Sequence, residues 1–295
     1  MLRTRLWMGT CLVLLMFGVL VLDLQFQPYY PFLGLFVGLV GFLGVLELRG
    51  MLPTVLRPHP LLAVLGVLAV LASPWLALCA IKWSSCDIAS VAYSHCSLYL
   101  FVAALGAGFL LEMATFYGPD GAIGRLCGLS FLAGYLGLLP CFLTQLRWLA
   151  PFEGHATWGR STAALILCIF TPKVGDIAAY FTGRSLGRRP MSPVLSPKKT
   201  LEGGMGGILG TTIFAVVVQL IEPAIEPGGV GGVLSAALLG AILGVVGILG
   251  DLAESLLKRD AGAKDASQTV PGFGGVLDVI DSILFCAPVV YCWLI

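Results

Sequence analysis

Long apolar runs, one after another, constrain this chain more than any other feature. A helix needs about 20 mostly apolar residues to cross the roughly 30 Å hydrocarbon core of a bilayer. Nine stretches come close to this requirement, at residues 6–22, 31–48, 61–81, 98–116, 123–143, 161–181, 205–221, 233–252 and 281–295. The runs are unbroken, unlike the short alternating strands of a β-barrel. They predict an all-α polytopic integral membrane protein with about nine transmembrane helices.

The composition supports the same class of protein. Of the 295 residues, 58% are hydrophobic and 11% are charged, whereas soluble domains carry roughly 25% charged residues. A soluble fold could not cover so much apolar surface, and disordered chains are polar. The net charge of +1 gives no general attraction to nucleic acid, so we expect no nucleic-acid partner.

The distribution of basic residues predicts the orientation in the membrane. With a cytoplasmic N-terminus, most of the 17 Lys and Arg residues fall in cytoplasmic segments, and Lys82, Arg147 and Arg160 fall outside. Cytoplasmic loops carry the excess of Lys and Arg. The first run is long for a signal peptide, and no small-x-small cleavage site follows it. We therefore expect a multi-pass protein of the inner (cytoplasmic) membrane, with its N-terminus inside and its C-terminus outside.

The two parts of the chain differ in how they use charge. Residues 1–160 place few ionisable groups inside a run, with Glu112 as an exception, and are expected to be structural or oligomerisation helices. Residues 161–295 are expected to be the catalytic transmembrane region, with polar cytoplasmic loops at 182–204 and 253–280. An ionisable group at membrane depth costs at least about 2.5 kcal/mol, so its default interpretation is functional.

The strongest polar pattern begins where the run 233–252 ends. Asp251, Glu254, Ser255 and Lys258 follow one another at i, i+3, i+4 and i+7, which places them on one helical face. A solvated amphipathic stripe has the same spacing. Because this stripe continues an apolar run, the pattern favours a functional site.

A second group of polar residues follows in the chain. Lys264 and Asp265 precede the turn-forming segment 271–275, and Asp278 and Asp281 then open the last run. Acidic residues in the first turn of a helix also act as caps. Capping accounts for one of these two carboxylates rather than for both.

The residue types indicate the chemistry. The three histidines, His59, His95 and His155, are isolated in the first part of the chain, and no C-x-x-C pair is present. Carboxylate oxygens without imidazole or thiolate favour Mg²⁺, with a second cation as an open alternative. Carboxylates, a hard cation and basic residues together are typical of phosphoryl or nucleotidyl transfer.

Another cluster lies in and after the run 161–181. Lys173 and Asp176 lie inside this run, and Lys198, Lys199 and Thr200 precede the glycine-rich run that follows. Helix N-terminal amides at that point could bind phosphate, although the G-x-x-x-x-G-K-[ST] pattern is absent. For Arg184, Arg188 and Arg189, an alternative interpretation is that they set the topology or contact anionic lipids. The spacing of Gly203, Gly206, Gly207 and Gly210 favours helix packing over catalysis.

At these positions the sequence resembles the phosphatidate cytidylyltransferase (CDP-diacylglycerol synthase) family. The resemblance rests on residues 255–259, Lys264-Asp265, the segment 271–275, and then Asp278 and Asp281. Residues 176–180 and 196–203 resemble a second conserved region of that family, and the layout of nine spans is similar. The chain departs from the family at Phe273, which is usually His, and at Val279, which is usually Arg.

The resemblance implies transfer of a cytidylyl group from CTP to phosphatidate, giving CDP-diacylglycerol and pyrophosphate in phospholipid biosynthesis. Phosphatidate would enter from the bilayer among other membrane lipids, and many family members are dimers, so a homodimer is expected. The implied catalytic residues are Asp251, Asp278, Lys258, Lys264 and Asp281; the implied substrate-binding residues are Lys198, Lys199, Thr200, Ser255, Arg259, Asp265, Gly274, Gly275 and Asp176; and the implied metal ligands are Asp251, Asp278, Asp281 and Glu254.

Three other interpretations are open at this point. A CTP-dependent polyprenol or phytol kinase shares part of the layout. An ion-coupled secondary transporter would use Asp176 and Asp251 as a cation pathway, although the charges gather at one membrane face and no repeat is visible. The departures at Phe273 and Val279 also allow an inactive scaffold. Separately, Cys86 and Cys96 in an outer loop could form a disulfide.

Overall fold

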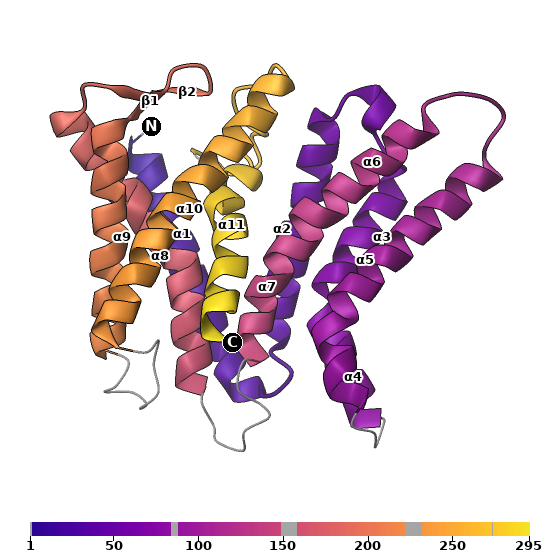
Figure 1. Ribbon diagram of the computed structural model, residues 1–295, viewed down its shortest axis with the longest axis horizontal. Helices are drawn as coiled ribbons and strands as arrows, with labels where there is room; N and C mark the ends of the chain where they lie inside the picture. Colours follow the sequence, from indigo (N-terminus) through magenta and orange to yellow (C-terminus); the bar gives the residue numbers. More distant parts are fainter. Residues whose placement is uncertain (1, 84–87, 149–157, 222–231, 273) are drawn as a thin grey trace. The chain divides into compact units, whose positions relative to one another are not determined.

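The computed structural model describes every residue except 1, 84–87, 149–157, 222–231 and 273 (Figure 1). Long α-helices dominate the described part. The helices are α1 (Leu2–Asp23), α2 (Pro31–Met51), α3 (Pro60–Leu71), α4 (Ser73–Trp83), α5 (Ile88–Ala114), α6 (Ala122–Leu132), α7 (Leu139–Gln145), α8 (Trp158–Leu186), α9 (Leu201–Ile221), α10 (Val233–Asp260) and α11 (Leu277–Leu294). Short 3₁₀ turns lie at Leu24–Phe26, Thr54–Leu56 and Leu146–Trp148, and a π-helical segment, Ala133–Leu138, joins α6 to α7.

The helices confirm an all-α polytopic membrane protein. Eight helices among the described residues are long and apolar enough to cross a bilayer. A ninth span is obtained if α3 and α4, which meet at a bend of 58°, are counted together. Each of the nine expected runs overlaps one of these spans, and the run 61–81 corresponds to the bent pair.

The ends of several helices differ from the expected ones. Helix α10 continues to Asp260, so residues 253–260, which we expected in a polar loop, are helical. Helix α11 begins at Leu277 rather than at residue 281. Both helices extend past their apolar runs because polar residues that share one face can continue an amphipathic helix. The connection between them is correspondingly shorter than the predicted 253–280.

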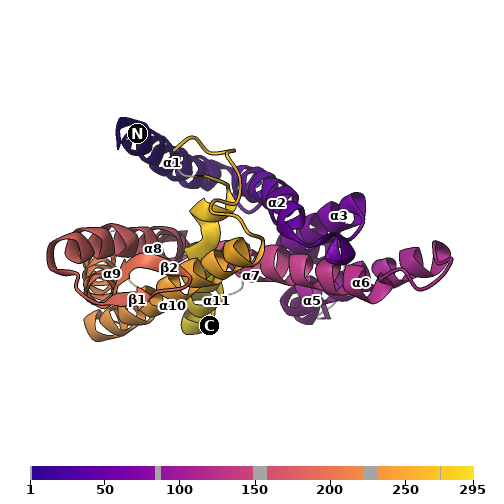
Figure 2. The ribbon, with the colours of Figure 1, turned by 90° about the horizontal axis from the view of Figure 1, so that it is seen from above.

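The expected loop 182–204 contains a small β-hairpin. Helix α8 runs to Leu186, strand β1 (Pro190–Ser192) pairs antiparallel with β2 (Ser196–Thr200), and α9 starts at once. Pro190 pairs with Thr200 and Ser192 with Ser196, with an irregularity between the two pairs. Seen from above, the hairpin lies over the ends of α8, α9 and α10 (Figure 2). The hairpin fixes residues 196–200 in an extended conformation.

The chain forms two compact units. The first unit is Met1–Thr144 together with Asp265–Val279, and the second is Gln145–Lys264 together with Ile280–Ile295. The segment after α10 therefore leaves the second unit, joins the first, and returns within α11. We describe each unit by itself.

In the first unit, helix α2 is capped by the helix before it. The Asp23 carboxylate, at the end of α1, is fully buried and accepts hydrogen bonds from the backbone N–H groups of Phe32 (2.9 Å) and Leu33 (2.8 Å). The first N–H groups of a helix lack partners within the helix. Asp23 supplies them, and its negative charge suits the positive end of the helix dipole.

The turn between α5 and α6 is held by an ion-pair cluster. Arg125 donates to both carboxylate oxygens of Glu112, at 2.8 and 2.5 Å, and to Asp120 Oδ1 at 3.0 Å. Two parallel N–H···O bonds are the strongest geometry of an Arg–carboxylate pair. Glu112, the one ionisable residue that stood out in the first part of the sequence, is therefore paired across this turn.

In the second unit, glycines let α9 pack closely against α8 and α10. A Cβ at Gly210 of α9 would lie 2.5 Å from Ala178 Cβ of α8. A Cβ at Gly240 of α10 would lie 2.7 Å from Thr211 O and 2.8 Å from Thr212 Cα, both in α9. Real Cβ atoms essentially never lie this close to other heavy atoms. The glycines of α9 thus serve helix packing, as their spacing indicated.

We predict that Gly240→Ala separates α9 from α10. The blocking atoms belong to backbone, which cannot move away like a side-chain end, so the free energy of unfolding should fall by about 1–3 kcal/mol. Thermal unfolding in detergent measures the loss. Gly38→Ala in α2, where nothing lies within 4 Å of the new methyl group, is the matched control. Equal unfolding temperatures for the two variants would contradict the assignment.

Candidate active site

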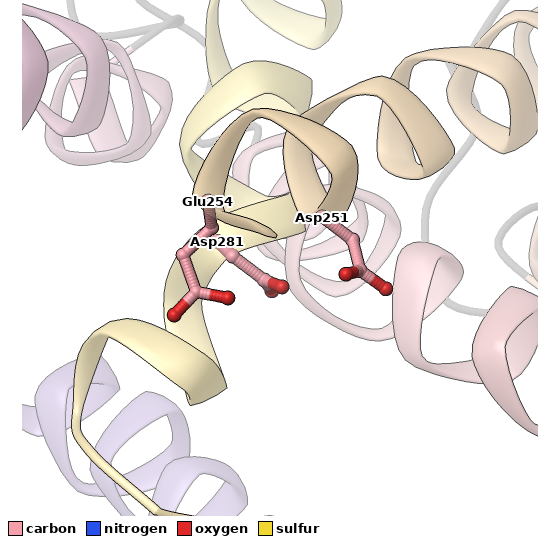
Figure 3. Close-up of side chains that lie close together, drawn as sticks. All are labelled: Asp251, Glu254 and Asp281. Atoms are coloured by element: carbon pink, nitrogen blue, oxygen red, sulfur yellow. The ribbon is translucent and has the colours of Figure 1, made fainter. Parts of the chain in front are cut away.

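Three carboxylates converge in the second unit. Asp251 and Glu254 lie on α10 and Asp281 lies on α11, and one carboxylate oxygen from each lies within 4.8 Å of the other two. The three side chains project toward the same side (Figure 3). Glu254 is 2% exposed and Asp281 is 6% exposed. Buried carboxylates this close repel one another strongly unless cations compensate them. We call these three residues the acidic cluster.

The local sequence explains why the cluster forms. Asp251 and Glu254 are three residues apart on α10 and so share a face. Just before them, a Cβ at Gly250 would lie 2.8 Å from Asp281 O and 2.9 Å from Ser282 Cα. Only glycine therefore lets the backbone of α10 approach α11 at this point, which brings the carboxylates of the two helices together.

Each carboxylate of the cluster has a lysine partner. Lys199, from strand β2, forms an ion pair with Asp251 Oδ2. Lys258 Nζ lies 2.6 Å from Glu254 Oε2, one helical turn along α10. These two contacts attach both the hairpin and the end of α10 to the cluster.

The third lysine comes from the middle of α8. Lys173 Nζ lies 3.4 Å from Asp281 Oδ1 and 3.7 Å from Asp176 Oδ2. It also donates to Ser282 Oγ at 2.9 Å. Three carboxylates face three ammonium groups, so the cluster is close to neutral without any ion, and Asp176 adds a further negative charge at its edge.

The remaining predicted residues of the second unit lie around the cluster. Ser255 donates to Asp251 Oδ1 at 3.5 Å, and the Thr200 hydroxyl accepts from Gly203 N at 3.1 Å, which caps α9. Arg259 donates to Leu195 O in the hairpin turn at 3.4 Å, so the hairpin and the end of α10 lie together. Lys198 and Lys264 are exposed and lie outside the ion pairs described above.

Asp278 belongs to the first unit and has a local role there. Its Oδ2 accepts hydrogen bonds from the backbone N–H groups of Gly275 (2.6 Å) and Ala266 (3.1 Å). Gly274 has a φ of +112°, and Asp265 is exposed in the same segment. Asp278 thus ties the loop before α11 to the first turn of the helix, and its expected role as a metal ligand stays a prediction.

The sequence alone does not reveal the contacts of two candidate functional residues, Lys173 and Glu47. Lys173 lies three positions before Asp176 in the sequence, but its pairing with Asp281 joins residues that are 108 positions apart. Glu47 lies at the end of the run 31–48, and a carboxylate beside an apolar run is itself a signal of function. Phe273 and Cys86, on which two further predictions rest, lie outside the described residues.

The acidic cluster fits a hard divalent cation. Its donors are carboxylate oxygens, which Mg²⁺ prefers, and their spacing suits one ion that keeps some of its water. Asp251, Glu254 and Asp281 would hold it, and the nearby lysines would then be released toward anionic groups.

The fold and the acidic cluster define a polytopic membrane protein with a polar centre suited to phosphate chemistry. The sequence model of the cytidylyltransferase family matches residues 3–295, and the chain belongs to this family.

Comparison with curated proteins gives the relatives. The phosphatidate cytidylyltransferase of Haemophilus influenzae is 28% identical over 94% of this chain and 93% of its own length. Those of Thermotoga maritima and Synechocystis sp. are 40% and 41% identical over 46% and 50% of this chain. The chain spans about half the length of the latter two relatives, 50% and 47% respectively.

We predict that Lys173→Met destabilises the protein by leaving Asp281 without its lysine. Breaking a fully buried ion pair costs about 3–5 kcal/mol; because the Lys173 side chain is 31% exposed, we expect about 1–3 kcal/mol. Thermal unfolding in detergent without divalent ions measures this. The double variant Lys173→Met/Asp281→Asn should recover part of the loss, whereas strictly additive losses would rule out the pairing.

Proposed function

We propose that the chain is a phosphatidate cytidylyltransferase. The observation that carries the proposal is a lysine-paired acidic cluster in a member of the cytidylyltransferase family. In the proposed reaction a phosphate oxygen of phosphatidate attacks the α-phosphorus of CTP. A new P–O bond forms, the bond from the α-phosphorus to the bridging oxygen breaks, and pyrophosphate leaves with that electron pair. Family membership favours this reaction over a prenol kinase or an ion-coupled transporter.

The residues have distinct tasks in this proposal. Asp251, Glu254 and Asp281 would hold Mg²⁺, with Asp278 as a further ligand predicted from the family resemblance. A bound Mg²⁺ neutralises phosphate oxygens and polarises the reacting phosphate. Lys199 and Lys258 would turn from their carboxylates to the triphosphate and the leaving pyrophosphate.

A general base is not needed for the nucleophile. A phosphate monoester carries about −1.5 to −2 charges near neutral pH, so the attacking oxygen of phosphatidate is already ionised. The protein has to place two anions next to each other, and the basic residues Lys198, Lys264 and Arg259 would lower the repulsion between them. The usual family histidine at position 273 is therefore dispensable for proton removal.

The proposal also includes an orientation. The hairpin and the end of α10 lie together, and we propose that this end faces the cytoplasm, where CTP is found. The N-terminus would then be cytoplasmic and the membrane would be the inner membrane. Phosphatidate would enter sideways from the bilayer, and a homodimer is a further expectation from the family.

The direct test uses purified protein with radiolabelled CTP, phosphatidate and Mg²⁺. We expect label in a lipid-soluble product that behaves as CDP-diacylglycerol, together with release of pyrophosphate. Label or phosphate transferred only to a prenol would favour the kinase instead. No turnover with either lipid, combined with ion-driven uptake into vesicles, would overturn the proposal in favour of a transporter.

We predict that Asp251→Asn and Asp281→Asn each lower kcat at least about 100-fold. Each change removes a negative charge that would hold the cation while keeping the shape of the side chain. Asp278→Asn should also abolish turnover with normal expression. The steady-state rate of pyrophosphate release is the measurement. Asp120→Asn, which changes an exposed carboxylate of the α5–α6 turn, is the control; wild-type rates in Asp281→Asn would refute the metal assignment.

The orientation predicts which segments react with reagents outside the cell. An epitope inserted between Ala261 and Gly262 should be protected from antibody in spheroplasts and become accessible after the inner membrane is permeabilised. An epitope added after Ile295 should be accessible in intact spheroplasts. The reverse pattern would show that the orientation is inverted.

A further inference from the structure

One carboxylate of α2 accepts three hydrogen bonds from a single distant segment. Glu47 Oε1 accepts from the Ser267 hydroxyl at 2.6 Å and from Val276 N at 2.9 Å. Glu47 Oε2 accepts from Leu277 N at 3.0 Å. All of these residues belong to the first unit. Glu47 therefore holds both the loop before α11 and the first residues of α11.

These contacts make Glu47 a cap of α11 supplied by another helix. The first N–H groups of a helix have no partners within it, and a polar residue just before the helix normally accepts from them. Position 276 is a valine, which has no side-chain acceptor. Glu47, a residue of α2, supplies the acceptor instead, and its charge also suits the positive end of the α11 dipole.

The loop is closed around the same carboxylate. The Ser267 hydroxyl also accepts from Thr269 N at 3.0 Å, and Val270 and Gly274 exchange backbone hydrogen bonds of 2.8 and 3.0 Å. Asp278 reaches back to Ala266 and Gly275, as described above. The segment from Ala266 to Asp278 is thereby held at several points by its own residues, and Glu47 holds it from another helix.

Two glycines of the loop are required by the carboxylates. A Cβ at Gly275 would lie 2.6 Å from Glu47 Oε2, and a Cβ at Gly274 would lie 2.6 Å from Asp278 Oδ2. These are the glycines that the family resemblance implied in substrate binding. The geometry gives them a separate task, since they make room for the carboxylates of Glu47 and Asp278.

We infer that Glu47 is a positioning residue for the reaction proposed above: by capping α11 it holds the first turn of the helix and so the direction of Asp278. Asp278 is the second residue of α11, so fraying of the first turn would release its carboxylate. Glu47 touches neither substrate nor cation in this role. The inference rests on the proposed function for its catalytic consequence and on geometry for the cap itself.

The test compares Glu47→Gln and Ser267→Ala with the full-length wild-type protein in detergent. Glutamine keeps the shape but loses the charge and one acceptor oxygen; alanine removes only the loop's hydroxyl. The control is Glu112→Gln, which changes a carboxylate of the first unit that is paired with Arg125 instead.

Two readouts are needed. The first is amide hydrogen exchange, without substrate or Mg²⁺, in peptides covering 265–279 and, for comparison, α8 and α9. The second is kcat together with the Mg²⁺ concentration that gives half-maximal rate. Partners that orient metal ligands typically change metal affinity or activity about 10–100-fold when they are lost.

For Glu47→Gln we expect exchange in 265–279 to accelerate about 10-fold, with α8 and α9 unchanged. The half-maximal Mg²⁺ concentration should rise, or kcat per folded protein should fall, about 10-fold. Ser267→Ala should show a smaller change in the same direction, and Glu112→Gln should match the wild type in both readouts. A partly unfolded population would lower the rate but would leave the Mg²⁺ requirement unchanged.

Other outcomes overturn the inference. Unchanged exchange in Glu47→Gln would show that the cap does not hold α11. Faster exchange with wild-type kcat and Mg²⁺ requirement would show a structural role only. If the wild-type protein itself makes no CDP-diacylglycerol, the proposed function fails, and the exchange data still decide whether Glu47 caps the helix.

Discussion

The site depends on the compensation of charge inside apolar helices. Burial removes water from a carboxylate, so each one needs a cation or several donors close by. Asp251, Glu254 and Asp281 meet this need with one lysine each. The lysines come from α8, the hairpin and α10, and the same ion pairs that make the carboxylates tolerable therefore also connect the elements of the second unit.

The ion pairs form because the helices approach closely. In a bilayer the lipid tails are as apolar as the side chains, so helix association relies on close packing and polar contacts. At Gly210, Gly240 and Gly250 a methyl group would lie 2.5, 2.7 and 2.8 Å, respectively, from an atom of the neighbouring helix. Gly250 has the most direct bearing on function, because it brings α10 next to the residues of α11 that complete the acidic cluster.

The sequence predicted the spans well and their ends poorly. About 20 apolar residues in a row leave little choice, whereas polar residues such as those at 253–260 look the same in a loop and in a helix leaving the membrane. The carboxylates of α10 and α11 were found because their spacing is local. The pairing of Lys173 with Asp281, and that of Glu47 with residues 220 to 230 positions later, depend on tertiary structure and leave no periodic pattern.

The sequence distance between Glu47 and its donors has a consequence for how the protein is made. Ribosomes add about 5–20 residues per second, so Glu47 leaves the ribosome about 10–40 s before Ser267, 220 residues later. During that interval α2 already carries its carboxylate without the three hydrogen-bond donors that it contacts in the finished fold. Helix α2 is thus completed only by a segment that is synthesised 220 residues later, and until then water or other groups must stabilise its carboxylate.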